Sequence, residues 1–362
     1  MDKVIEIAPE VVLVGGDVFH QVRPNNTAIV FAHQQFSRLR HALPDAEIVM
    51  VAGNHDTPRS ADTGSILRLF ESLGIHVIDG EAQPIEFPRL SLTVLGVAMN
   101  PHPRPLLVPS GSTRYNVLLL HGATEGEYAG YGGPPDAAAN EIPEDELHVA
   151  AWDYVALGHY HVHKSPNRRG NAYYSGAIDY TSSNVWGERV EEKELGVKGK
   201  GIVERDLATG RHTFHVLPAS REFVDLRSFS AKGMTADEVN EAIVQTVEAV
   251  PGGIDDKVVR LVVYDMPRHL ARSLDHKRLR EYRRSALHFQ LDTHRPELIR
   301  RTGGGAPGRR ASLEEFVRDK LRDRQIPPDI DREAFVSLGV KYLKDAEERE
   351  TTSAMTAARL DG

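Results

Sequence analysis

Short apolar runs alternate with polar loops through the first half of the chain. The runs are rich in Val, Leu and Ile and occupy residues 11–14, 48–52, 92–98, 117–120 and 154–157. Continuous runs this short, bounded by turn-forming residues, predict strands that are buried on both faces. Helical spacing occupies residues 25–43 and 63–73, and Pro24 stands where the first turn of a helix tolerates proline. This alternation predicts an α/β domain built on buried sheets.

A smaller unit follows the first domain. Residues 202–206 and 212–217 predict a hairpin that closes the first domain, and the new unit begins near Arg221. Thr235 and Glu238 are spaced as a capping box, which marks the start of a helix. The unit is completed by two strands and a basic helix, at residues 257–264, 287–291 and 275–284. These elements predict a small α+β domain.

The end of the chain predicts a linker and a helical tail. Residues 303–311 are rich in glycine, and two amphipathic helices are expected within residues 312–350. Helices this short need a partner or their own domain to bury their apolar faces, and both arrangements stay open. The predicted segments are therefore residues 1–220, 221–302, 303–311, 312–350 and a disordered end at 351–362.

Composition and charge limit the class of protein. The 362-residue chain has no cysteine, which excludes thiolate metal sites, thiol catalysis and disulfides. No apolar run approaches the roughly 18 residues of a membrane span, and we expect a cytoplasmic protein. The net charge of −8 argues against a nucleic-acid binder, but residues 268–324 hold 16 basic and 8 acidic residues. That basic block favours a polyanion or an acidic partner, with a solvated surface as the alternative.

Candidate chemistry follows the predicted strands. Asp, Asn or His comes directly after four of them, in the segments Gly16-Asp17, Gly53-Asn54-His55-Asp56, His121-Gly122 and Gly158-His159-Tyr160-His161. Each segment alone also fits a turn, a helix cap or a loop histidine. Their shared position predicts a common site, because ligands of α/β folds gather at the carboxyl ends of strands. His163 continues the alternation after His161 and is interpreted as a structural histidine.

These residue types point to metal-dependent phosphate chemistry. Asp, Asn and His without Cys suit divalent ions such as Mn²⁺, Fe²⁺ or Zn²⁺. A carboxylate can bridge two ions, and paired ions about 3.5–4 Å apart clamp the phosphorus centre during hydrolysis. A nearby histidine that binds no metal can then contact the phosphate or protonate the leaving oxygen.

The order of these motifs resembles the calcineurin-like metallophosphoesterases. It is most similar to the SbcD-type DNA repair exonucleases, the nuclease subunits of SbcC–SbcD complexes. His20 with Arg23-Pro24, and residues 174–181, carry that closer resemblance. The region after Arg221 resembles the DNA-facing capping domain of the family, and the tail resembles its ATPase-binding helices. The resemblance implies an αββα sandwich of two sheets, a small α+β cap and a C-terminal helical tail.

The resemblance also implies roles for individual residues. The resemblance implies two divalent ions, with Mn²⁺ as the favoured metal. Their ligands would be Asp17, Asn54, His121, His159 and His161. Asp17 would bridge the two ions, and His161 would bind the second ion. His55 would contact the phosphate and assist the leaving group, and His20 would position the DNA strand. The implied protein is an exonuclease and endonuclease of double-strand-break repair that acts on duplex ends. Its implied partner is an SbcC-type coiled-coil ATPase, bound by a nuclease homodimer within a heterotetramer.

One departure from the family affects the second ion. The family opens with a strand ending in Asp-x-His, whose two residues bind that ion, whereas here Val4 follows Asp2 at the histidine position. Met1 begins where the family is already in the next helix, so a sheet edge would be exposed. A wrongly chosen start site, a gene fragment and a degenerate subunit all explain this, and the intact remaining motifs favour the first. A phosphoesterase for a nucleotide or phosphoprotein and a catalytically crippled subunit that binds DNA or the ATPase remain alternative functions.

Overall fold

The computed structural model forms two compact units. It describes residues 1–58, 64–99, 105–109, 113–124, 141–143, 145–166, 170–182, 184–296, 313–322, 324 and 331–342. The first unit comprises residues 1–264 and 268–293, and the second comprises residues 265–267 and 294–362. The predicted linker at 303–311 and the predicted disordered end at 351–362 lie outside the described residues.

Two sheets form the centre of the first unit. A parallel sheet has the order β1 (Val11–Val14), β2 (Glu47–Val51), β3 (His76–Ile78). A five-stranded sheet has the order β4 (Gln83–Phe87), β5 (Leu92–Val97), β6 (Tyr115–His121), β7 (Tyr154–Gly158), β8 (Ala172–Tyr174). Only β4 of this sheet runs antiparallel to its neighbour. The five strands expected from apolar runs are confirmed, whereas β3, β4 and β8 were not predicted.

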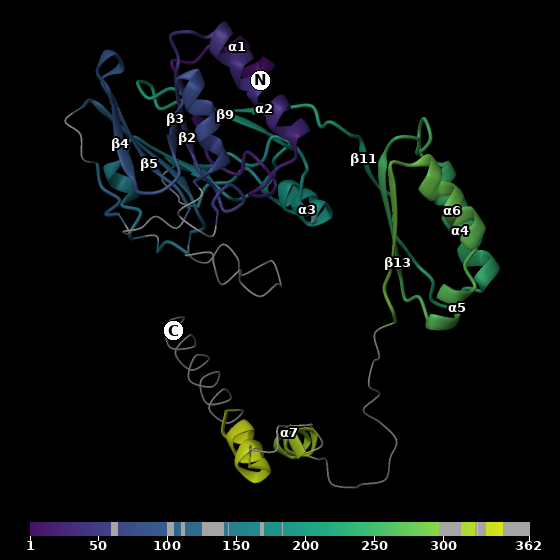
Figure 1. The fold of residues 1–362 in the computed structure, drawn as a ribbon. Helices are drawn as coiled ribbons and strands as arrows, with labels where there is room; N and C mark the ends of the chain where they lie inside the picture. Colours follow the sequence, from purple (N-terminus) through teal and green to yellow (C-terminus); the bar gives the residue numbers. More distant parts are fainter. Residues whose placement is uncertain are drawn as a thin grey trace, which may run out of the picture. The chain divides into compact units, whose positions relative to one another are not determined.

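The two sheets pack face to face, as β2 illustrates. Successive side chains of a strand point to opposite faces. Val49 and Val51 pack with Val94 and Leu119 of the five-stranded sheet. Ile48 and Met50 enter a second cluster with side chains from α2 (Asn26–Ala42) and the 3₁₀ helix η2 (Ile66–Leu73). The chain therefore forms an α/β sandwich, with α2 beside the smaller sheet in Figure 1.

Residues 2–14 form a short helix and an edge strand. The segment from Met1 begins in a helix, α1 (Asp2–Ile7), and Arg38 of α2 holds Asp2 at 2.6 Å. β1 is at the edge of its sheet, where its four residues are only half-buried. From residue 64 on, the segment expected to be helical at 63–73 differs from an α-helix. There the chain forms the 3₁₀ helix η2, capped at its start by the Ser65 hydroxyl and ended by Gly74 at a φ of 69°.

A hairpin and a four-stranded sheet complete the first unit. The hairpin pairs β9 (Gly201–Arg205) with β10 (His212–Val216), as predicted. The four-stranded sheet contains β11 (Phe223–Asp225), β12 (Phe229–Ser230), β13 (Val258–Tyr264) and β14 (His288–Thr293). β13 pairs in parallel with β11 and β12 on one side and with β14 on the other. Helices α4 (Ala236–Glu248), α5 (Arg268–Arg272) and α6 (His276–Ser285) lie along this sheet (Figure 1).

Local signals in this region predicted α4 and α6, whereas α5 was not predicted. The capping box of Thr235 and Glu238 is present, and Val239, Ile243 and Val247 are buried on one face of α4. One further helix, α3 (Val185–Leu195), was not predicted, because its sequence is mostly charged and contains Gly187. Trp186 of α3 donates a hydrogen bond to Gln290 of β14 at 3.0 Å.

The second unit contains the described part of the helical tail. α7 (Leu313–Arg322) is present, and residues 332–342 are helical. These two helices pack so closely that a Cβ on Gly339 would overlap the side chain of Leu321. Val336 and Val340 are buried. In the described part of the chain, no helix has both the length and the apolar character needed to cross a membrane.

A stack of four rings anchors the hairpin to the five-stranded sheet. His163 lies parallel to Phe214 with ring centroids 4.2 Å apart, and Tyr173 lies on His212 at 3.8 Å. His163 is therefore a structural histidine, with its Nδ1 donating to the Tyr174 carbonyl at 2.9 Å. Burial, with the charges of His163 and Arg205, lowers the pKa of His212 to about 4. The stack holds His212 in its neutral form at neutral pH.

This neutral histidine makes stability depend on pH. The unfolded chain takes up a proton at His212 near pH 6.5, whereas the folded chain resists it until about pH 4. Stability from this group is therefore complete above pH 6.5 and is lost as the pH falls toward 4. We expect His212→Phe to keep the stack and reduce this loss, measured by urea unfolding of the metal-free protein at several pH values. His41→Gln, at an exposed position on α2, is the control. An equal pH dependence in parent and His212→Phe would contradict the prediction.

Candidate metal centre

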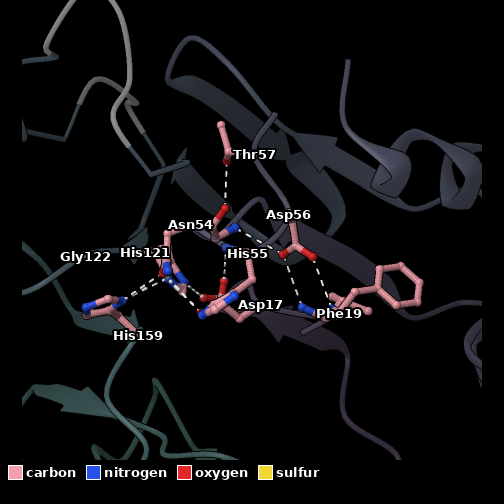
Figure 2. A network of polar contacts seen from close by, with 12 residues as sticks. Asp17, Phe19, Asn54, His55, Asp56, Thr57, His121, Gly122 and His159 are labelled. Carbon is pink, nitrogen blue, oxygen red and sulfur yellow. Dashed lines mark hydrogen bonds and ion pairs between the residues drawn. The ribbon is translucent and has the colours of Figure 1, made fainter. Parts of the chain in front are cut away.

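The four polar segments meet where strands of both sheets end. Asp17 follows β1 and Asn54 follows β2 in the smaller sheet. His121 ends β6 and His159 follows β7 in the larger sheet. Figure 2 shows these side chains directed toward one another. The site therefore draws on both layers of the sandwich.

The donor atoms of these side chains lie at the spacing of ligands around one ion. Asn54 Oδ1 is 3.1 Å from both His121 Nε2 and His159 Nδ1, and the two ring nitrogens are 3.3 Å apart. Asp17 Oδ2 lies 3.4 Å from His121 Nε2. Ligands at bond lengths near 2.1 Å are separated by about 3.0–3.5 Å in octahedral or tetrahedral sites. Asp17, His121 and His159 could therefore hold a divalent metal ion, with Asn54 as a fourth ligand.

Glycines allow the loops to approach this closely. A Cβ on Gly53 would overlap the carboxylate of Asp17, and one on Gly16 would overlap the ring of His121. A Cβ on Gly158 would overlap the carbonyl of Gly15. Gly16 also has a φ of 91°, which glycine adopts without steric cost. The glycines that precede the polar residues are thus required by the packing of the site.

His121 presents a lone pair to the cluster. Its ring is almost fully buried, and its Nδ1 lies 2.6 Å from the Gly15 carbonyl oxygen. Since a carbonyl only accepts, Nδ1 carries the proton and Nε2 faces Asp17 and Asn54 unprotonated. Burial lowers the pKa of His121, which keeps its ring neutral at pH 7.

His159 has an unusual backbone conformation. Its φ of 105° is rare for a residue with a side chain, and strain of this kind concentrates at functional sites. Burial, with the charge of His121, lowers the pKa of His159 to about 4. The ring is therefore neutral at pH 7, with Nδ1 directed at Asn54 and His121.

Asp56 joins the two loops that carry Asp17 and Asn54. It is fully buried, and its carboxylate accepts backbone N–H groups of Val18, Phe19 and Gly53 at 3.1–3.2 Å (Figure 2). Burial raises the pKa of Asp56 to about 6, although these hydrogen bonds oppose the shift. The sequence analysis assigned no role to Asp56. The signal that could have indicated one is its place as the last residue of the polar segment Gly53-Asn54-His55-Asp56.

The remaining predicted site residues lie around this cluster. The rings of His20 and His55 stack with centroids 5.4 Å apart, and the backbone N–H of His55 donates to Asp17 Oδ1 at 2.9 Å. His161 is outside the metal-binding set identified among the described residues. Its charge nevertheless lowers the pKa of His121 and His159, so the ring lies within electrostatic reach. The Nδ1 of His161 is 2.7 Å from Oε1 of Glu188, a residue that sequence reasoning missed.

The glycine packing makes a direct prediction. We expect Gly53→Ala to lower Mn²⁺ affinity at least tenfold, because its methyl group displaces the Asp17 carboxylate. The measurement is isothermal titration calorimetry on the metal-free protein. Gly80→Ala is the matched control, since nothing lies within 4 Å of its Cβ. Unchanged affinity in Gly53→Ala would show that Asp17 is not a ligand.

Comparisons with known proteins identify relatives of the chain. No family model matches it. It is 29% identical over 180 residues to the DNA double-strand break repair protein Mre11 of Methanopyrus kandleri, covering 45% of this chain and 38% of the relative. The Mre11 of Methanocaldococcus jannaschii is 37% identical over 79 residues, covering 22% and 21%, and that of Methanococcus maripaludis is 26% identical over 230 residues, covering 58% and 55%. The matches thus span from about a fifth to about half of the relatives' lengths. The expected resemblance to SbcD-type nucleases is confirmed to this extent: the chain is similar, over part of its length, to three Mre11 proteins.

Proposed function

We propose that the chain is a Mn²⁺-dependent DNA nuclease that hydrolyses phosphodiester bonds with two metal ions during double-strand-break repair. The convergence of Asp17, Asn54, His121 and His159 at ligand spacing carries this proposal. The similarity to Mre11 proteins, which are named for DNA double-strand break repair, supports DNA repair as the process in which the chain acts. Exonuclease and endonuclease action on duplex ends follows from the same resemblance.

The proposed roles divide between ion binding and phosphate handling. Asp17, Asn54, His121 and His159 would bind the first ion, and Asp17 and His161 the second. Bound ions would lower the pKa of an attacking water and neutralise charge on the phosphate oxygens. His55, half-buried beside Asp17, would contact the phosphate and protonate the leaving oxygen. His20, exposed and stacked on His55, would position the DNA strand.

The proposed partners correspond to surfaces outside this cluster. Exposed basic residues on α5 and α6 would contact DNA phosphates: Arg268, Arg272, Lys277, Arg280, Arg283 and Arg284. The helices at 313–322 and 332–342 would bind an SbcC-type coiled-coil ATPase. We further propose a homodimer within a heterotetramer, acting in the cytoplasm.

One observation favours a second candidate function, a subunit that binds a metal ion without hydrolysis. Among the described residues, the metal-binding set contains Asp17, His121 and His159, whereas His161 contacts Glu188. Such a subunit would bind one ion per chain. Metal stoichiometry therefore separates it from the two-ion nuclease.

The nuclease proposal predicts a specific loss in His55→Ala. We expect this variant to reduce Mn²⁺-dependent degradation of end-labelled duplex DNA by at least a hundredfold, because the leaving oxygen loses its proton donor. Two Mn²⁺ ions should still bind, since His55 is not a proposed ligand. His41→Ala is the control for replacing an exposed histidine.

Three outcomes would count against these assignments. Loss of both ions in His55→Ala would show that His55 is a metal ligand. A folded parent that binds one ion and leaves the DNA intact would favour the non-catalytic subunit. Faster turnover of small phosphodiesters than of DNA would contradict a nuclease.

The basic helix α6 predicts a salt-dependent interaction. We expect the double variant Arg283→Ala/Arg284→Ala to reduce the slope of log affinity against log salt by about two, since two phosphate contacts are lost. The measurement is fluorescence anisotropy with labelled duplex ends between about 50 and 200 mM salt. Lys198→Ala/Arg211→Ala removes two exposed charges from the first domain and is the control. An equal change in both double variants would exclude α6 as the phosphate-binding element.

A further inference from the structure

The ring of His161 is held by a buried carboxylate. Its Nδ1 lies 2.7 Å from Oε1 of Glu188, which comes from α3. The Glu188 side chain is only 4% exposed, whereas that of His161 is 37% exposed. One nitrogen of the imidazole therefore faces the protein interior, and the ring itself reaches solvent.

Lys200 fixes this carboxylate in place. Its Nζ lies 2.7 Å from Oε2 of Glu188 and 3.0 Å from Oε1 of Glu192, and its side chain is 2% exposed. The same Nζ donates to the backbone carbonyl of His161 at 2.7 Å. Tyr180 donates to Oε2 of Glu192 at 2.6 Å. Lys200 therefore lies between the two buried carboxylates, and both the ring and the backbone of His161 are held.

The contact with Glu188 decides which nitrogen of His161 is free. A carboxylate accepts hydrogen bonds, so Nδ1 carries a proton, and in the neutral ring Nε2 therefore keeps its lone pair. Carboxylates orient metal-binding histidines in this way in other proteins, where they fix the tautomer and raise the basicity of the ligand nitrogen.

We propose that Glu188 is a positioning residue that holds His161 with Nε2 available to the second metal ion. The inference rests on the proposed function in one respect, namely that His161 is a ligand. Glu192 separates this role from a purely structural one. Glu192 lies one turn further along α3 and pairs with the same lysine. Its carboxylate also accepts a hydrogen bond from Tyr180.

The test compares Glu188→Met with Glu192→Met. Each variant removes one carboxylate and leaves Lys200 paired with the other, so the structural cost is matched. The tautomer of His161 is read from long-range ¹H–¹⁵N NMR correlations of the metal-free protein near pH 8, assigned with His161→Gln. Mn²⁺ stoichiometry and affinity are measured by isothermal titration calorimetry.

We expect the parent and Glu192→Met to show His161 protonated at Nδ1 and to bind both ions alike. Glu188→Met should shift the proton toward Nε2 and weaken the second ion about 10- to 100-fold, leaving the first unchanged. Glu188→Gln keeps an acceptor oxygen and should give an intermediate result. It also carries the test where Glu188→Met does not fold.

Two results would overturn the proposal. One is a Glu188→Met protein with the parent's tautomer and the parent's affinity for the second ion. The other is an equal loss in Glu192→Met, which would make the cluster structural. A parent that binds a single ion would contradict the proposed two-ion function instead. In that case the tautomer alone decides, since a proton that stays on Nδ1 in Glu188→Met would refute positioning.

Discussion

Asp56 accepts three backbone hydrogen bonds that hold the loop after β1 against the loop after β2. Asp17 and Asn54 are carried by these two loops, so their distance from each other depends on this carboxylate. Gly53 makes the same contact possible, because no side chain fits between it and Asp17. A buried acid with a raised pKa is costly by itself, and it persists here because three N–H donors surround it. The part of the candidate metal centre that the smaller sheet contributes follows from this one junction.

The two buried histidines of the candidate metal centre are neutral in the metal-free protein. Burial keeps His121 and His159 neutral, so their lone pairs are not lost to protons at pH 7. The Gly15 carbonyl orients His121, and Glu188 contacts His161 in the same manner. In the metal-free protein, Oδ1 of Asn54 lies 3.1 Å from Nε2 of His121 and 3.1 Å from Nδ1 of His159. Both Oδ1 of Asn54 and the unprotonated Nε2 of His121 are electron-pair donors, which is the arrangement that a cation requires.

Prediction from the sequence succeeded where one local signal was enough. Strands buried on both faces appear as continuous apolar runs, and β2, β5, β6 and β7 were found that way. β3 and β8 have three residues each, too few for a period to be visible. α3 buries the charged side chains of Glu188 and Glu192 beside Lys200. Its sequence therefore lacks the apolar stripe from which a helix is predicted.

The sequence by itself indicated which loops meet at the candidate site, because the residues directly after a buried parallel strand lie at the carboxyl edge of the sheet. It also limited the donor atoms that a metal ion would meet there, since Asp, Asn and His are the candidate ligands in a chain without cysteine. Only the tertiary structure decided how these ligands are oriented. The partners of His121 and His161 are 106 and 27 residues away in the chain, at Gly15 and Glu188. No local pattern specifies such pairs, because they form only when the two sheets and α3 pack together.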